Sequence, residues 1–144
     1  SPHTASYQDE SIKDNNRSCV LRITSVYGSI LLTGDMERPV EMALAESSAE
    51  ALKSDVLIAP HHGSRTSSSE TLLDAVSPQM AIFTVGYRNR FGHPKADIVD
   101  RYSRRGIRTY RSDVDGAVLL RFNEKEGLSA KSWRKAQRRY WHDK

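Results

Sequence analysis

Three short apolar runs suited to β-strands alternate with helical segments, and a polar group suited to chemistry follows each run. Strands that alternate with helices favour an α/β fold, in which the carboxyl ends of parallel neighbouring strands share one edge where ligands bind. We therefore predict an α/β layered sandwich, with a mixed sheet, helices on one of its faces and a site at the carboxyl edge. The runs are 29–33, 55–60 and 80–85, and the polar groups are Asp35, His61-His62 and His93.

Local patterns predict the elements around these runs. Residues 18–26 largely alternate apolar and polar side chains, which indicates a half-buried strand with Cys19 toward the core. Gly28 provides the turn into the second strand. Ser67-x-x-Glu70 has the form of a capping box and marks the start of a helix. The predicted helices cover 39–52, 68–76 and 95–105.

The chain of 144 residues is long enough for one domain, and no apolar run approaches the roughly 18 residues of a membrane span. It opens in polar sequence without a methionine, so we expect an excised piece of a longer protein. We predict an irregular segment over 1–17, the domain over 18–123 and a basic tail over 124–144. The domain would end in a hairpin of two strands, 107–111 and 117–122.

The tail carries the excess positive charge. Up to Asn123 the chain has 15 Lys and Arg against 15 Asp and Glu, whereas the last 21 residues have 7 against 3, which accounts for the net charge of +4. Trp133, Tyr140 and Trp141 are interspersed with these cations, a pattern that suits single-stranded DNA. The alternative, which we favour, is a packed helix over 129–141 with a solvated face.

The residues at the strand ends have structural and functional interpretations. Asp35 follows Gly34, as in a turn or a helix cap, but a carboxylate can also bridge two cations. The adjacent His61 and His62 are harder to explain as structure, because they crowd two imidazoles before Gly63. Neutral imidazole is the commonest nitrogen ligand of divalent cations. Since neighbouring side chains diverge, we expect one histidine to bind metal and the other to contact substrate.

The loop over 86–94 contains the third candidate group. His93 either caps the helix that follows Pro94 or faces the site. Arg88 and Arg90 precede it, and arginine matches phosphate through bidentate hydrogen bonds, so the loop could bind a phosphodiester. The alternative for both arginines is ordinary surface charge.

In this order, the segments resemble the metallo-β-lactamase-type domain of ComEC-family DNA internalization proteins. The resemblance extends from about Asn15 to Phe122, and it implies that the chain is the C-terminal half of that layered sandwich. The matching segments are Asn15-Asn16-Arg17-Ser18, Leu31-Leu32-Thr33-Gly34-Asp35, residues 59–69, residues 85–94 and Ser112-Asp113-x-Asp115-Gly116-Ala117.

The resemblance implies a hydrolase in which two divalent cations, zinc or manganese, activate a water that attacks a phosphodiester or amide. Asp35 would bridge the cations, and His62 would be a metal ligand. The catalytic group would include Asp35, His61 beside the substrate and His93 at the mouth of the site. No small-molecule cofactor is implied. The substrate-binding positions would be Ser64, Arg88, Asn89 and Arg90.

The sequence departs from the family because it lacks the main metal motif, His-x-His-x-Asp-His. Of its five histidines, His3 is a candidate for one further upstream ligand, and the others are His61, His62, His93 and His142. We therefore expect this chain alone to be inactive.

For the parent protein, the resemblance implies a metal-dependent nuclease that acts on DNA during import. The DNA would be single-stranded and would lie beside the membrane channel region of the same chain. The domain would belong to an inner-membrane protein and lie on its outer, periplasmic side. The alternative is a non-catalytic domain that guides DNA or has a structural role. A phosphocholine esterase is a third hypothesis, against which the loop at 87–94 argues.

Overall fold

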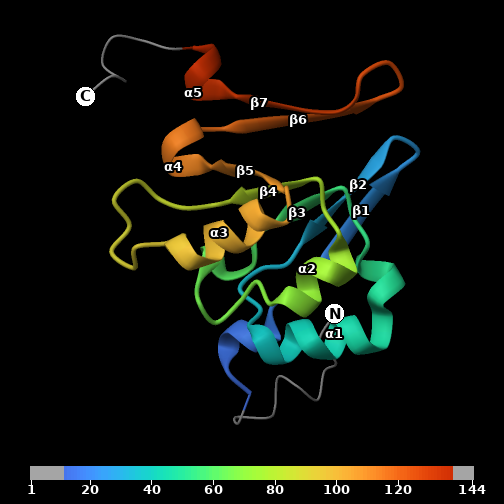
Figure 1. Ribbon diagram of the computed structural model, residues 1–144, viewed down its shortest axis with the longest axis vertical. Helices are drawn as coiled ribbons and strands as arrows, with labels where there is room; N and C mark the ends of the chain where they lie inside the picture. The colour runs from blue at the N-terminus through green and yellow to red at the C-terminus, as the bar shows by residue number, and fades with distance from the viewer. Residues whose placement is uncertain (1–11, 138–144) are drawn as a thin grey trace.

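A computed structural model describes residues 12–137, and it has the α/β layered architecture predicted from the sequence (Figure 1). His3, Tyr140, Trp141 and His142 lie outside the described residues. A large sheet has the strand order β1-β2-β3-β4-β5, and a second sheet pairs β6 with β7. The strands are β1 (Leu21–Ser25), β2 (Gly28–Leu32), β3 (Val56–Ile58), β4 (Met80–Phe83), β5 (Arg108–Arg111), β6 (Val118–Asn123) and β7 (Gly127–Ser132).

A helix follows each of the strands β2, β3 and β4, as the sequence predicts. No helix within residues 12–137 combines the length and the apolar character needed to cross a membrane. The three helices are α1 (Arg38–Leu52), α2 (Glu70–Val76) and α3 (Ala96–Arg104). Shorter helical turns are η2 (Asp14–Arg17), η3 (Pro60–Gly63), α4 (Ser112–Asp115) and α5 (Trp133–Ala136).

Four strands of the large sheet run in the same direction. β2, β3, β4 and β5 are parallel neighbours, and only β1 is antiparallel, paired with β2. Leu31 lies opposite Leu57, and Leu57 lies opposite Ala81, so the three site-bearing strands are in direct register. Their carboxyl ends therefore meet at one edge of the sheet, as predicted.

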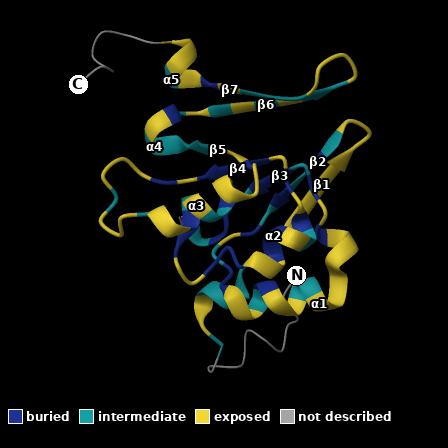
Figure 2. Cartoon of the chain, viewed as in Figure 1, coloured by how far each residue is buried: buried dark blue, intermediate teal, exposed yellow. Residues whose placement is uncertain are grey.

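Alternate residues of the central strands face two different layers. Leu57 and Phe83 pack into a core with residues of α1, α2 and α3. Val56, Met80 and Ile82 pack on the other side, against residues of β6 and β7. Figure 2 shows the buried residues gathered along β3 and β4. Because both faces are covered, these strands have continuous apolar sequences instead of alternating ones.

Strand β1 is exposed along its whole length, so the prediction of a half-buried strand is wrong. Leu21 and Ile23 are 51% and 50% exposed. Cys19, expected in the core, is also exposed and precedes the strand. β1 is an edge strand that pairs with β2 alone, and no other described element covers its faces. An alternating pattern shows that a strand has two different faces, but it does not show what covers them.

The C-terminal elements also differ from the prediction. β5 joins the large sheet, so it forms no hairpin with β6; β6 pairs with β7 instead. The helix expected over 129–141 is a strand as far as Ser132, followed by the short turn α5. Leu128 and Ala130 explain this, because on a strand they pack with Val118 and Leu120 over the second face of the sheet. Residue 124, the predicted start of the tail, falls within this β6–β7 hairpin.

Helix α2 begins two residues later than the capping box indicates. Ser69 is the N-cap, and its hydroxyl accepts a hydrogen bond from the Leu72 N–H at 3.2 Å. The Ser67 hydroxyl instead donates to the carbonyl of Pro60 at 2.8 Å. The buried carboxylate of Glu41 accepts from the Ser69 N–H at 2.7 Å. Through its hydrogen bond to the Pro60 carbonyl, Ser67 holds the turn that carries the histidine pair.

Candidate functional site

The structure brings four of the predicted site residues close together at the carboxyl edge. Asp35 follows β2, the histidine pair lies in η3 after β3, and His93 lies in the loop between β4 and α3. Asp35 Oδ1 is 3.5 Å from His62 Nε2. The ring centres of His61 and His93 are 6.0 Å apart. A carboxylate and three imidazoles thus form one polar group.

The turn that carries the histidine pair has an unusual backbone. His61 and His62 both adopt left-handed conformations, with φ of 47° and 56°, and Gly63 follows at φ 80°. A left-handed conformation is uncommon for residues other than glycine and costs of order 1 kcal/mol or more. Such strain is concentrated at functional sites, so this turn is a candidate for function independently of its residue types.

The variant His62→Gly should be more stable than His62→Ala, by about 1 kcal/mol, because glycine adopts a positive φ without steric cost. Urea unfolding of the two variants measures the difference. The matched control is Ala43→Gly in the exposed middle of α1, where φ is helical and glycine should destabilise the chain by about 1 kcal/mol. Equal stability of the two His62 variants would show that this backbone carries no strain.

One ring nitrogen of His62 lies within hydrogen-bond distance of a hydroxyl, and the other faces the Asp35 carboxylate. Nδ1 lies 3.2 Å from the hydroxyl of Thr84, the residue after β4, and Nε2 faces Asp35. The side chains of His62 and Asp35 are 46% and 45% exposed. A histidine that binds metal usually donates its second ring N–H to an oxygen, as the Nδ1–H tautomer of His62 would donate to Thr84.

The geometry of this pair fits one metal ion. Two ligands of a tetrahedral ion, each about 2.1 Å from it, lie roughly 3.4 Å apart. The separation of 3.5 Å between Asp35 Oδ1 and His62 Nε2 agrees with that figure. However, no group of three or more His, Cys, Asp or Glu side chains suited to a metal occurs within residues 12–137. Asp35 and His62 could therefore be two ligands of such an ion, but the described residues do not complete a metal site.

Both ring nitrogens of His61 lie near polar side chains other than Asp35. Nδ1 lies 3.2 Å from Thr66 Oγ1 and 3.6 Å from Glu37 Oε1. Nε2 lies 3.5 Å from the side-chain nitrogen of Asn15. Burial alone would raise the pKa of the Glu37 carboxyl, but hydrogen bonds from Thr66 and Asn15, together with the charges of Lys13 and His61, lower that pKa overall. Glu37 is thus a carboxylate at neutral pH and orients His61.

The segment before β1 belongs to the site, although its sequence lacks periodicity. The Ser18 hydroxyl accepts a hydrogen bond from the Asp35 N–H at 2.9 Å. The Asn16 side-chain oxygen accepts from the Glu37 N–H at 3.0 Å. Sequence reasoning about function missed Glu37, Thr66 and Thr84, and it included Asn15-Asn16-Arg17-Ser18 only as part of a resemblance. That cluster of small polar residues was the available signal.

The loop between β4 and α3 holds His93 firmly. The Asn89 side chain accepts from the His93 N–H at 2.9 Å and donates to the His93 carbonyl at 2.7 Å. Burial, followed by the charges of Lys95 and the two neighbouring histidines, lowers the pKa of His93. Its ring is therefore neutral at neutral pH. Asn89, predicted to bind substrate, uses these hydrogen bonds to shape the loop.

The remaining predicted substrate-binding residues lie at different depths. Ser64 is buried, with its hydroxyl 3.2 Å from that of Thr66. Arg88 and Arg90 are exposed, and their guanidinium groups lie over the rings of Tyr87 and Phe91. Ser64 thus supports His61 through Thr66, whereas the two arginines are accessible to a ligand.

The chain is similar to segments of much longer proteins. No protein-family profile matches it. It is 37% identical over 135 residues to competence protein ComA of Neisseria gonorrhoeae, a match that covers 94% of this chain and 19% of that protein. It is 34% identical to ComE operon protein 3 of Bacillus subtilis, covering 78% of this chain and 14% of that protein. It is 38% identical to recombination protein 2 of Haemophilus influenzae, covering 76% and 14%.

These matches agree with the motifs found in the sequence. They span most of this chain but less than a fifth of each relative. One of the relatives is named a competence protein. The chain is therefore homologous to a stretch within the much longer proteins of the ComEC family.

Proposed function

We propose that this chain is part of a DNA-handling domain of a DNA-uptake protein, and that it supplies part of a metal-dependent phosphodiesterase site. The name of the competence relative supports the first part of this proposal. The second part is supported by the pairing of Asp35 with His62 at the carboxyl edge of the sheet. In the parent protein this domain would lie beside the membrane channel region, on the outer side of the inner membrane.

The single observation that carries the proposal is the geometry of His62. Its Nδ1 is held by Thr84 while its Nε2 is directed at Asp35. Together with Asp35, it would hold a divalent cation, zinc or manganese, which when bound supplies an activated water for attack on phosphorus. His61, oriented by Glu37, would lie beside the substrate and hold a proton at its ring nitrogen. Arg88 and Arg90 would bind phosphate oxygens of DNA.

A second function is a domain that guides DNA without cutting it. The observation that favours it is the small number of ligands, because Asp35 and His62 alone do not complete a metal site in residues 12–137. The arginines and the loop between β4 and α3 would serve equally in that role. The two functions make different predictions for Asp35: the phosphodiesterase requires this residue, whereas a domain that only guides DNA does not.

The isolated chain should bind Zn²⁺ or Mn²⁺ weakly, with a dissociation constant in the micromolar range or above, because affinity depends on the number and geometry of ligands. Isothermal titration calorimetry measures it. Asp35→Ala and His62→Ala should each abolish the binding, whereas Asp97→Ala, an exposed carboxylate paired with Arg65, should leave it unchanged. Submicromolar affinity that is lost in Asp35→Ala would contradict the incomplete site.

A further inference from the structure

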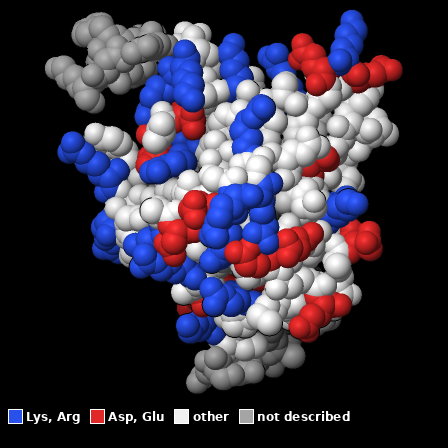
Figure 3. All heavy atoms as spheres, in the orientation of Figure 1, with Lys and Arg blue, Asp and Glu red and all other residues white. Residues whose placement is uncertain are grey.

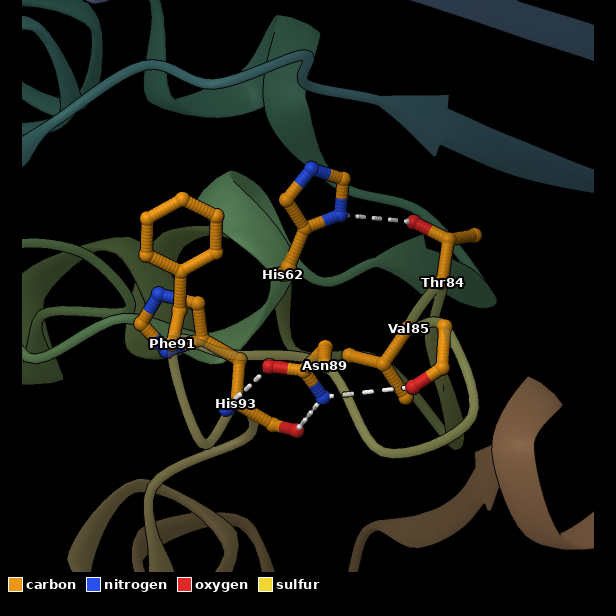
Figure 4. A pocket seen from close by; sticks show the side chains of 7 residues that line it. His62, Thr84, Val85, Asn89, Phe91 and His93 are labelled. Atoms are coloured by element: carbon orange, nitrogen blue, oxygen red, sulfur yellow. Dashed lines mark hydrogen bonds between the residues drawn. The ribbon is translucent and has the colours of Figure 1, made fainter.

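A small pocket adjoins the candidate site and shares His62 and His93 with it. Its volume is about 210 Å³. Figure 4 shows Phe91, His62, Val85 and Asn89 around this hollow. The volume is below the roughly 300–1,000 Å³ of pockets that enclose drug-sized ligands, so it suits one small planar group. The lining residues are His62, Thr84, Val85, Gly86, Asn89, Phe91 and His93.

The aromatic wall of the pocket is pre-organised. Phe91 stacks on His93, with ring centres 5.9 Å apart and planes inclined by 14°. Lys95 Nζ donates to the Phe91 carbonyl at 2.6 Å, and the hydrogen bonds of Asn89 close the same loop. Phe91 is nevertheless 60% exposed, although an isolated phenyl group gains by burial. The loop therefore holds an apolar ring in contact with solvent, next to the site.

Two polar side chains of the pocket, those of Asn89 and Thr84, are already hydrogen-bonded, whereas His93 Nδ1 is buried without a hydrogen-bond partner among the described residues. Both N–H groups of the Asn89 amide donate within the loop, to the carbonyls of Gly86 and His93. The hydroxyl of Thr84 is hydrogen-bonded to His62 Nδ1. The pocket therefore favours a planar ligand that it recognises mainly by stacking and shape.

The loop that forms much of the pocket is positively charged. Residues 86–95 contain Arg88, Arg90 and Lys95 and no acidic residue. Arg90 Cζ lies 4.8 Å from the centre of the Phe91 ring, and Arg88 Cζ lies 5.2 Å from that of Tyr87, which is 72% exposed. Figure 3 shows Lys and Arg side chains along the edge of the molecule that this loop forms. Exposed aromatic rings beside cations are typical of surfaces that bind single-stranded nucleic acid.

From these features we infer that the pocket is a subsite for one unpaired nucleobase, with Phe91 as its stacking wall and Arg88 and Arg90 on the flanking phosphates. In a duplex the faces of a base are covered by its neighbours, so the subsite selects single-stranded DNA. Binding would depend little on base identity, because every base has a face that can stack. The inference rests on the proposed DNA-handling function and adds the feature of DNA that is recognised.

The test compares two oligonucleotides with the same number of phosphates, a thymidine 15-mer and a fully abasic 15-mer. Fluorescence anisotropy with the whole chain, in EDTA, makes the result independent of any metal. The wild-type chain should bind the thymidine 15-mer on the order of tenfold more tightly than the abasic one. Phe91→Ala should remove this preference, and Phe91→Tyr should retain it. Arg90→Ala should weaken both complexes by a similar factor and reduce their salt dependence.

The matched control is Tyr27→Ala, which removes an exposed aromatic ring in the β1–β2 turn, away from the carboxyl edge. It should leave both affinities unchanged. Melting temperatures check that Phe91→Ala remains folded. Equal affinity of the wild-type chain for the two oligonucleotides would overturn the nucleobase subsite but leave phosphate binding and the proposed function intact. Absence of binding to both would overturn the subsite together with the proposed handling of DNA.

Discussion

In a longer family member that contains this chain, Asp35→Asn and His62→Ala should each lower the hydrolysis of single-stranded DNA by more than about 100-fold. This magnitude follows because the replacement of residues that only orient metal ligands already lowers metal affinity or activity about 10–100-fold. Thr84→Ala should fall in that smaller range, since Thr84 holds His62 by its Nδ1 atom. The three variants therefore rank the roles assigned to them.

The measurement is the initial rate of DNA cleavage with saturating Mn²⁺ or Zn²⁺, compared at equal concentrations of folded protein. Asp97→Asn is the matched control, because this exposed carboxylate pairs with Arg65 on the surface. A wild-type rate in Asp35→Asn would exclude metal-dependent cleavage at this edge. The non-catalytic function, in which the domain guides DNA, would then be the better account.

Gly63→Ala should destabilise the chain by about 2–4 kcal/mol, which combines a strained positive φ with an overpacked core. Gly63 has φ +80°, so an alanine would be strained in any surroundings. Its Cβ would also lie 2.7 Å from Pro94 Cβ and 2.8 Å from two carbons of the Phe83 ring. Phe83, the last residue of β4, is fully buried against Tyr102 of α3, so it has little room to move.

Gly106→Ala separates the two contributions. Gly106 has φ +70°, but a Cβ added there would meet no atom within 4 Å beyond its chain neighbours, so alanine should cost only about 1 kcal/mol. Urea unfolding of both variants gives the difference that comes from packing. If the two substitutions cost the same, the contact of η3 with Phe83 and Pro94 does not constrain the histidine turn.

The architecture that positions the site could be predicted from the sequence, because local patterns determine it. Apolar runs that alternate with helices identified β2, β3 and β4 and the helices between them. Parallel pairing then follows from those connections, and with it the meeting of Asp35, His62 and His93 at one edge. The residue types also indicated which side chains could bind metal, although their distances could not be known.

The tertiary structure alone decided which surfaces are covered and which partners the site residues have. β1 is exposed because no described element lies against it, and residues 127–132 form a strand because they cover the second face of the sheet. Asn15 approaches His61 across 46 residues, and Thr84 approaches His62 across 22. A contact of this kind leaves no periodic pattern in the sequence, because its two residues are far apart in the chain. Helix and strand periods reflect the backbone, whereas the polar contacts of the site depend on how the layers pack.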